Sequence, residues 1–106
     1  MTTLRIEHPI TDYIVWKQAF DRFSDLRQQH GVRSHVIRRP VDDPHYVVAE
    51  LDFDTAEAAQ AFLGILQSRV WSTPANSPAL AGDPITRILA TEDGPVTAQP
   101  FRHQRS

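Results

Sequence analysis

Polar and apolar residues alternate at the amino terminus and again in the middle of the chain. Residues 3–8 read Thr-Leu-Arg-Ile-Glu-His before Pro9, and a period of two is typical of a strand with one buried face. Residues 32–39 and 45–53 are further alternating or β-branched runs, joined by the turn-forming segment 40–44 with its prolines and aspartates. These patterns predict an amino-terminal strand and, later, a β-hairpin.

Between the first strand and the hairpin, apolar residues recur at spacings of three and four. Thr11 or Asp12 can cap a helix there, and the helix should end near Gln29, because Gly31 permits the positive φ of a helix terminus. The predicted apolar face consists of Trp16, Ala19, Phe20, Phe23 and Leu26. This stripe is typical of plain core packing, and the alternative is that it lines a ligand cavity.

A second helix is predicted after the hairpin. Asp54-Thr55-Ala56-Glu57 resembles a capping box in which Asp54 accepts the amide of Glu57 and the Glu57 carboxylate reaches back. The face that follows consists of Ala58, Ala59, Phe62, Ile65, Leu66 and Val70. Its alanines favour close packing on a sheet.

The remaining chain predicts one more strand and a tail. Residues 71–83 contain two prolines and a glycine and indicate an irregular connection, whereas 85–92 reads as a fourth strand that Asp93-Gly94-Pro95 ends. We therefore expect one domain over 1–93 and a carboxyl-terminal tail over 94–106.

The predicted order is β-α-β-β-α-β, a ferredoxin-like α+β sandwich with two helices on one face of a four-stranded antiparallel sheet. The opposite face is predicted to carry the even positions 46–52, together with Thr86, Ile88 and Ala90 and one of the two alternating sets in 33–37. His35 is expected either to make a hydrogen bond in that interface or to act as a base. A half-covered sheet of this kind usually meets a partner, and we expect a homodimer.

Composition narrows the function classes. The chain has 106 residues, no cysteine and a formal net charge of −2, which excludes disulfides, thiolate metal sites and cysteine nucleophiles and argues against nucleic-acid binding. No apolar run approaches the length of a membrane span, and the amino terminus is not a targeting segment. We expect a cytoplasmic protein that binds neither nucleic acid nor membrane.

Several short segments carry a resemblance to a known family. They are Asp12-Tyr13 with Trp16-Lys17 and Phe20-Asp21, Gly31-Val32, Asp42-Asp43-Pro44, and Phe53-Asp54 leading into Glu57-Ala58-Ala59 and Phe62. Over Leu4 to Glu92 the chain resembles the dimeric α+β-barrel superfamily that includes the antibiotic-biosynthesis monooxygenase-like (ABM-like) proteins. The resemblance implies two sheets packed face to face across a dimer axis and a small cavity between each sheet and its own helices.

The resemblance also implies a chemistry. Oxygenases of this superfamily need no metal, flavin or haem, because an electron-rich aromatic substrate reduces oxygen once its deprotonated form is stabilised. Trp71 and Arg87 occupy places comparable to the pocket tryptophan and arginine of those relatives, and a guanidinium suits a phenolate or enolate. The alternative is that Arg87 is a surface residue and Trp71 a lid over the core. Haem-degrading relatives have a downstream histidine ligand, but here the first histidine after Trp71 is His103, so no cofactor is predicted.

Two further residues complete the predicted site. Tyr13, near a helix start, can reach a cavity mouth and donate to a ligand oxygen, or it can simply pack. His8 and His45 both project toward the helices if their strands are neighbours, and either could be a base. The alternative for both is a surface or hairpin role. We take His45 as the base, Arg87 as the anion stabiliser, and Trp71 and Tyr13 as the residues that contact the substrate.

The sequence thus predicts a dimeric α+β-barrel protein that binds a small aromatic or polyketide-like compound, as a cofactor-independent monooxygenase or related tailoring enzyme. The alternative is a non-catalytic dimeric binding or stress-associated module in which the same residues only pack. A roomy cavity with converging polar groups favours the enzyme, and a closed apolar one favours the binding module.

Overall fold

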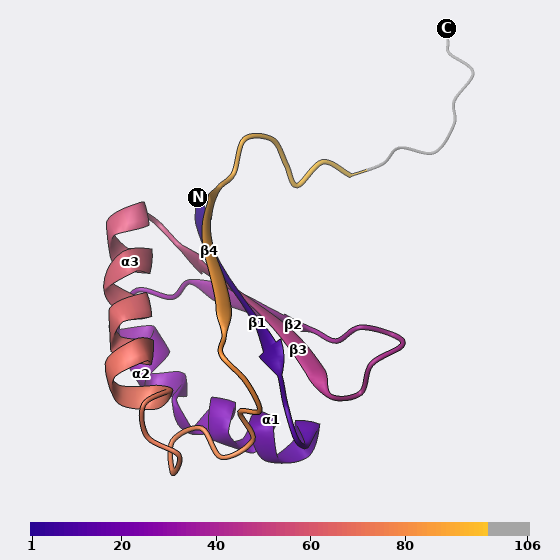
Figure 1. Ribbon diagram of the computed structural model, residues 1–106. Coiled ribbons are helices and arrows are strands. Elements are labelled where there is room, and N and C mark those ends of the chain that lie inside the picture. The colour runs from indigo at the N-terminus through magenta and orange to yellow at the C-terminus, as the bar shows by residue number, and fades with distance from the viewer. Residues whose placement is uncertain (98–106) are drawn as a thin grey trace, which may run out of the picture.

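Four strands form one antiparallel sheet (Figure 1) in the structure, a computed structural model that describes residues 1–97. The strands are β1 (Thr2–Pro9), β2 (Ser34–Arg38), β3 (Tyr46–Phe53) and β4 (Ile85–Ala90), in the spatial order β2-β3-β1-β4. The first strand is therefore central and lies beside the third, as predicted. His103 and the rest of 98–106 lie outside the described residues.

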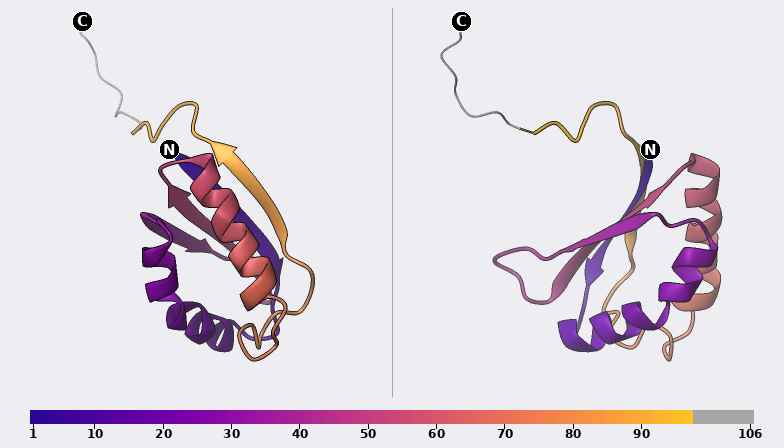
Figure 2. Two further views of the ribbon diagram at one scale, coloured as in Figure 1. Left: turned by 90° about the vertical axis from the view of Figure 1, so that its left-hand side faces the viewer. Right: turned by 180° about the vertical axis from the view of Figure 1, so that it is seen from behind.

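The helices cover one face of the sheet (Figure 2). They are α1 (Tyr13–Arg22), α2 (Ser24–Gln29), α3 (Ala56–Ile65) and a π-helical turn, η1 (Leu66–Val70), that continues α3. The predicted ferredoxin-like α+β class and element order are confirmed. No helix in residues 1–97 has the length and apolar character needed to cross a bilayer.

The first predicted helix is wrong in one respect, because it breaks at Phe23. That residue leaves helical geometry at φ −100° and ψ 19°, and its amide turns back to the carbonyl of Phe20 at 3.2 Å. Asp12 is the amino-terminal cap of α1, accepting from the amide of Val15 at 3.0 Å. The break turns α2 away from the axis of α1 (Figure 2).

The cap of α3 also differs from the prediction. Thr55, not Asp54, is the capping residue, and its hydroxyl accepts from the amide of Ala58 at 3.1 Å. Asp54 instead forms an ion pair with Arg33 at 2.6 Å. The cap therefore lies one residue later than predicted, because the Asp54 carboxylate pairs with Arg33, which directly precedes β2.

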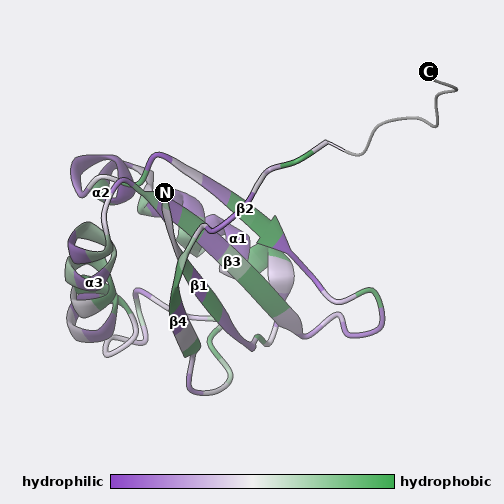
Figure 3. Cartoon of the chain, turned by 90° about the horizontal axis from the view of Figure 1, so that it is seen from above, coloured by the Kyte–Doolittle hydropathy of each residue, from purple (hydrophilic) through white to green (hydrophobic). Residues whose placement is uncertain are grey.

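Hydrophilic and hydrophobic residues alternate along the strands (Figure 3), so the two faces of the sheet carry different sets of side chains. Even positions of β1 and odd positions of β3 are buried against the helices, as predicted for β3. In β4 the prediction is wrong: Ile88 pairs with Leu4, so Thr86, Ile88 and Ala90 face the helices and Ile85, Arg87 and Leu89 face outward. In β2 the outward set is Ser34, Val36 and Arg38. We call this outward side the open face.

The core lies between α3 and the central strands. Phe62 of α3 and Phe53 of β3 are both almost fully buried, with ring centroids 5.8 Å apart. Leu4, Ile6, Ala49, Leu51 and Ala59 complete the buried cluster. This packing holds α3 directly on the sheet, whereas α1 and α2 stand farther out (Figure 1).

A pair of valines tests where the stability resides. Val47 on β3 is completely buried, whereas Val41 at the hairpin tip is fully exposed. We expect Val47→Ala to lower the free energy of unfolding by about 1.5–3 kcal/mol, and Val41→Ala to change it by less than about 0.5 kcal/mol. Urea titration followed by circular dichroism measures both, and equal effects would contradict the assigned facing of β3.

Candidate ligand-binding site

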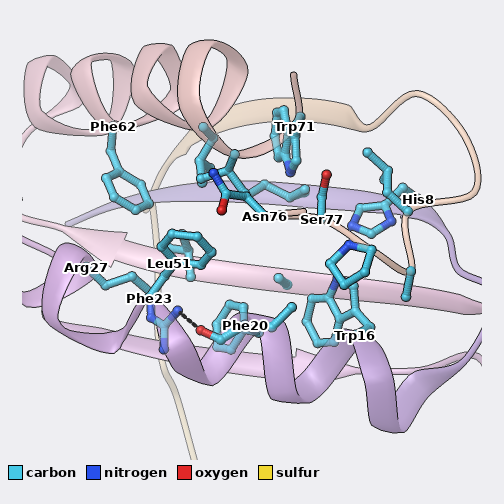
Figure 4. Close-up of a pocket in the computed structure, with 18 residues that line it drawn as sticks. His8, Trp16, Phe20, Phe23, Arg27, Leu51, Phe62, Trp71, Asn76 and Ser77 are labelled. Atoms are coloured by element: carbon cyan, nitrogen blue, oxygen red, sulfur yellow. Dashed lines mark hydrogen bonds between the residues drawn. The ribbon is translucent and has the colours of Figure 1, made fainter. Parts of the chain in front are cut away.

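A pocket of about 70 Å³ lies between the sheet, the helices and the loop that follows η1 (Figure 4). Ile6 of β1 with Ala49 and Leu51 of β3 form its sheet side. Ala49 on the sheet side and Ala19 on α1 leave space in the pocket because neither side chain extends beyond Cβ. The volume is below the range of about 300–1,000 Å³ that holds typical ligands.

Five aromatic side chains, from Trp16, Phe20, Phe23, Phe62 and Trp71, line the pocket. Trp16 and Phe20, one turn apart on α1, are stacked with centroids 5.1 Å apart and planes at 22°. Phe23 continues this row, and Phe62 and Trp71 face it from the side of α3 and η1 (Figure 4). The predicted stripe therefore lines a cavity, which was the less favoured of its two interpretations.

His8 lies at one end of this pocket (Figure 4). Its side chain projects from β1 toward the helices, is 3% exposed and lies 6.1 Å from the Trp16 ring. Its Nδ1 is 2.9 Å from the carbonyl oxygen of Pro9, and because a carbonyl can only accept, Nδ1 must carry the proton. Burial lowers the pKa of His8 from its ordinary value of 6.5, which favours a neutral ring with a lone pair on Nε2.

Arg27 of α2 lies at the other end of the row of rings (Figure 4). It is 7% exposed, its Nη1 donates to the carbonyl of Phe20 at 2.6 Å, and its guanidinium stacks 3.7 Å from the centroid of the Phe20 ring. Burial lowers the pKa of Arg27, and nearby Asp21 opposes that shift. The guanidinium stays charged at physiological pH.

The loop after η1 closes the pocket. Asn76 and Ser77 line it (Figure 4), and Asn76 is held by its Nδ2, which donates to the carbonyl of Arg69 at 2.7 Å. Farther along, the amide of Thr11 donates to Ala79 at 2.9 Å and the amide of Ala81 donates to Pro9 at 3.2 Å. These hydrogen bonds connect the loop to η1 and to the end of β1.

The structure brings one of the four predicted site residues into the pocket. Trp71 lines it, as the family resemblance implied. Arg87 is exposed on the open face opposite Arg5, because its odd position in β4 points away from the helices. The predicted position of Arg87 at the pocket is therefore wrong.

His45 and Tyr13 also lie outside the pocket lining. His45 precedes β3, is exposed, and contributes its carbonyl to the amide of Ile10 at 2.8 Å. Tyr13 stacks on the far side of Trp16 and under the guanidinium of Arg39, 4.2 Å from its ring. Neither residue is therefore at the pocket, and the histidine that lines it is His8.

His35 is likewise displaced from its expected position. It faces the helix side of β2, opposite Leu51, with its ring edge against Phe20 at 5.1 Å. Burial, followed by the positive charges of Arg27 and Lys17, lowers its pKa. It is therefore not a residue of the open face.

Arg27 is the residue that sequence reasoning missed. The signal was present, because Trp16, Phe20, Phe23 and Arg27 follow one another at spacings of four, three and four and share a helical face. An arginine in an apolar stripe predicts either a snorkelling side chain or a buried charge. Only the break at Phe23, which turns α2, decides for the buried charge.

The pocket offers few groups that could hold a metal or cofactor. In residues 1–97 no three histidine, aspartate or glutamate side chains are grouped as metal ligands, and His8 is the one pocket-lining residue of those types. The available groups are aromatic faces, one imidazole, one guanidinium and the side chains of Asn76 and Ser77. This set suits a flat organic ligand.

Solved structures with the same architecture include named oxygenases. SnoaB, a cofactor-independent oxygenase from Streptomyces nogalater, superposes with a TM-score of 0.67 over 89% of this chain and 95% of its own, at 12% identity. The ActVA-Orf6 monooxygenase of Streptomyces coelicolor, in complex with nanaomycin D, gives 0.64 over 92% of each chain, also at 12% identity. The chain has the ABM fold.

A dimeric ferredoxin-like protein from an uncultured marine organism is also similar to this chain, with a TM-score of 0.63, 11% identity, and coverage of 92% of this chain and all of its own. No family model matches the sequence, and no curated protein matches it. The resemblance found in the sequence is therefore confirmed at the level of the ABM fold.

The buried imidazole predicts a specific pH dependence. Because burial lowers the pKa of His8 below 6.5, the folded protein binds fewer protons than the unfolded chain between the two pKa values. The stabilisation is full above pH 6.5 and decreases as the pH falls toward the folded pKa. In urea titrations at one protein concentration, the stability of the wild type relative to His8→Gln should therefore decrease from pH 8 to pH 5.

Nuclear magnetic resonance gives an independent reading of the same group. The ring protons of His8 should titrate with a midpoint below 6.5, the ordinary histidine value. A midpoint at or above that value would show that burial does not disfavour the charged ring, and it would contradict the predicted loss of stability between pH 8 and pH 5. His35, whose pKa is also lowered, is present in both the wild type and His8→Gln. Its contribution to the pH dependence therefore cancels when the stabilities of these two proteins are compared.

Proposed function

We propose that the protein binds a small flat aromatic compound in this pocket and oxygenates it without a cofactor. The observation that carries the proposal is the aromatic-walled pocket with His8 at one end and Arg27 at the other. Once the pocket enlarges, the rings of Trp16, Phe20 and Trp71 offer stacking surfaces to a flat ligand. SnoaB, which is similar in fold, is a cofactor-independent oxygenase.

The chemistry begins with proton removal. Nε2 of His8 carries the lone pair when Nδ1 donates to Pro9, so it can take a proton from a phenol or an acidic C–H group. The resulting carbanion forms a bond to O₂, giving a hydroperoxide after protonation. Loss of water then leaves a carbonyl: anthrone plus O₂ becomes anthraquinone plus water, with the substrate supplying the electrons.

Ligand entry requires the pocket to enlarge, because about 70 Å³ does not hold a fused-ring compound. The loop over 72–84 is the element suited to move, because its first part, with Asn76 and Ser77, lies at the pocket and is largely exposed, whereas Ala79 and Leu80 anchor its far end beside Ile10. Trp71, partly buried at its start, would move with it. Closure over the ligand then excludes bulk water from the reacting atoms.

Filling the pocket from α1 tests the proposal. Ala19 is 5% exposed and lines the pocket, so Ala19→Leu places three extra carbon atoms in it. We expect binding of 1-naphthol, measured by calorimetry, to weaken about tenfold or more, and oxygen uptake with anthrone to fall in parallel. Ala61→Leu, the same change at an exposed position of α3, is the matched control.

Two results would count against the proposal. If neither naphthol binding nor anthrone-dependent oxygen uptake occurs with the wild type, the pocket does not have the proposed role. If Ala19→Leu and Ala61→Leu behave alike while circular dichroism shows both folded, any binding takes place elsewhere.

The small volume favours a second candidate, a non-catalytic binding module. In that case the aromatic row, stacked at 5.1 Å between Trp16 and Phe20, holds a ligand and no reaction follows. Binding of 1-naphthol without oxygen uptake for any dihydroxyaromatic or anthrone would favour this candidate over the oxygenase.

We also propose that the protein is a homodimer joined through the open face. Val36, Ile85 and Leu89 expose 42%, 60% and 37% of their surfaces on this face. Its charges are largely paired within the sheet, Arg5 with Glu7 at 3.1 Å and with Glu50 at 3.4 Å, and Arg38 with Glu50. Paired charges around apolar side chains suit burial against a second copy, and the marine protein of the same fold is dimeric.

Light scattering tests this assembly. The wild type should have twice the monomer mass of 12.0 kDa at micromolar concentration. Val36→Asp should shift it toward the monomer, because a carboxylate would be buried opposite the partner. Val15→Asp on the outer side of α1 is the control, since Val15 is 40% and Val36 42% exposed. A monomeric wild type would refute the dimer.

A further inference from the structure

Arg27 is a buried cation without a carboxylate partner among the described residues. The ion pairs of residues 1–97 involve Arg5, Lys17, Arg33 and Arg38, and none involves Arg27. Asp21, the acidic residue whose charge acts on Arg27, is exposed and binds Lys17 Nζ at 2.7 and 3.0 Å. The positive charge at this end of the pocket is therefore uncompensated by a carboxylate.

Two neighbours account for part of the burial of Arg27. The carbonyl of Phe20, in the last turn of α1, accepts from Nη1, and the Phe20 ring lies under the guanidinium. A cation at a helix carboxyl terminus and over an aromatic face is favourable. These contacts use one N–H group, and no other side-chain donor of Arg27 forms a hydrogen bond within 1–97. A buried charge with open donors is costly to keep.

The remaining charges near Arg27 do not satisfy it. On β2, His35 makes an edge contact with the Phe20 ring and has its own pKa lowered, with the charge of Arg27 as the second-largest cause. On α1, Lys17 is cationic and engaged by Asp21. These neighbours thus offer the guanidinium a ring, a carbonyl or another base, and Arg27 itself lines the pocket.

We propose that Arg27 binds the anionic group of the ligand, which is an aromatic compound bearing a carboxylate or another negatively charged oxygen. This inference rests on the proposed function, in which the pocket binds a flat aromatic compound. A guanidinium with free donors makes charge-assisted hydrogen bonds to such oxygens. The row His8, Trp16, Phe20, Arg27, each in contact with the next, orients the ligand with its anion at Arg27 and its opposite end at His8.

The test compares two ligands of the same shape, 2-naphthoate and 2-naphthamide, by calorimetry on the full chain. The wild type should bind the carboxylate about tenfold or more tightly than the amide. Arg27→Met should reduce this ratio to about one by weakening only the carboxylate. Arg27→Lys should keep part of the preference. Arg69→Met removes one exposed positive charge beside the same loop and should leave the ratio unchanged.

The amide separates this inference from the function on which it rests. If the wild type binds the amide and shows no preference for the carboxylate, the anion site is refuted and the aromatic pocket stands. If neither ligand binds in the pocket, as judged by Ala19→Leu, both fail. Loss of the preference in Arg87→Met with its retention in Arg27→Met would move the role to Arg87 and overturn the assignment. Because the wild-type ratio needs no variant, a poorly folded Arg27→Met leaves the inference testable.

Discussion

The packing of α3 on the sheet is the interaction on which the rest of the structure depends. Phe62 and Ala59 of α3 meet Leu4, Leu51 and Phe53 with almost no exposed surface. The alanine lets the helix approach, and the two phenylalanines fill the space between layers. The aromatic rings of α1, from Trp16 and Phe20, stand between that helix and the rest of the molecule. The pocket lies among these rings, next to the small side chains of Ala19 and Ala49.

The turn at Phe23 connects this architecture to the chemistry of the pocket. Had α1 continued straight, the Phe20 carbonyl would have been used within the helix and Arg27 would have remained on its surface. Instead the carbonyl accepts from the amide of Phe23 and from Arg27. The break therefore provides hydrogen-bond donors for the Phe20 carbonyl in the last turn of α1, and it also places the Arg27 guanidinium in a buried position. A feature of helix geometry thereby gives an otherwise apolar cavity one charged end.

This chain shares the ABM fold with proteins to which it is only 10–12% identical. Such divergence is possible because a half-buried strand needs only alternating apolar residues, and a covering helix needs only apolar residues three or four positions apart. The chemistry of the site is more local. In this chain the guanidinium that lines the pocket comes from Arg27 of α2 and the imidazole from His8 of β1. Arg87 of β4 lies on the open face. The fold is thus compatible with an aromatic-binding pocket whose polar residues are its own.

The sequence by itself determined the elements and their order, since periodicity is a local property: residues 3–8 and 46–53 alternate, and the stripe from Trp16 to Phe23 has helical spacing. It also located Trp71, through the family resemblance. Register and the break in the helix are non-local. A shift of one residue in the pairing of β4 with β1 decides whether Arg87 or Ile88 faces the helices, and α2 must turn at Phe23 before Arg27 reaches the pocket. Such choices are made by contacts between segments distant in the chain, so only the tertiary structure shows that His8 and Arg27, and not His45 and Arg87, line the pocket.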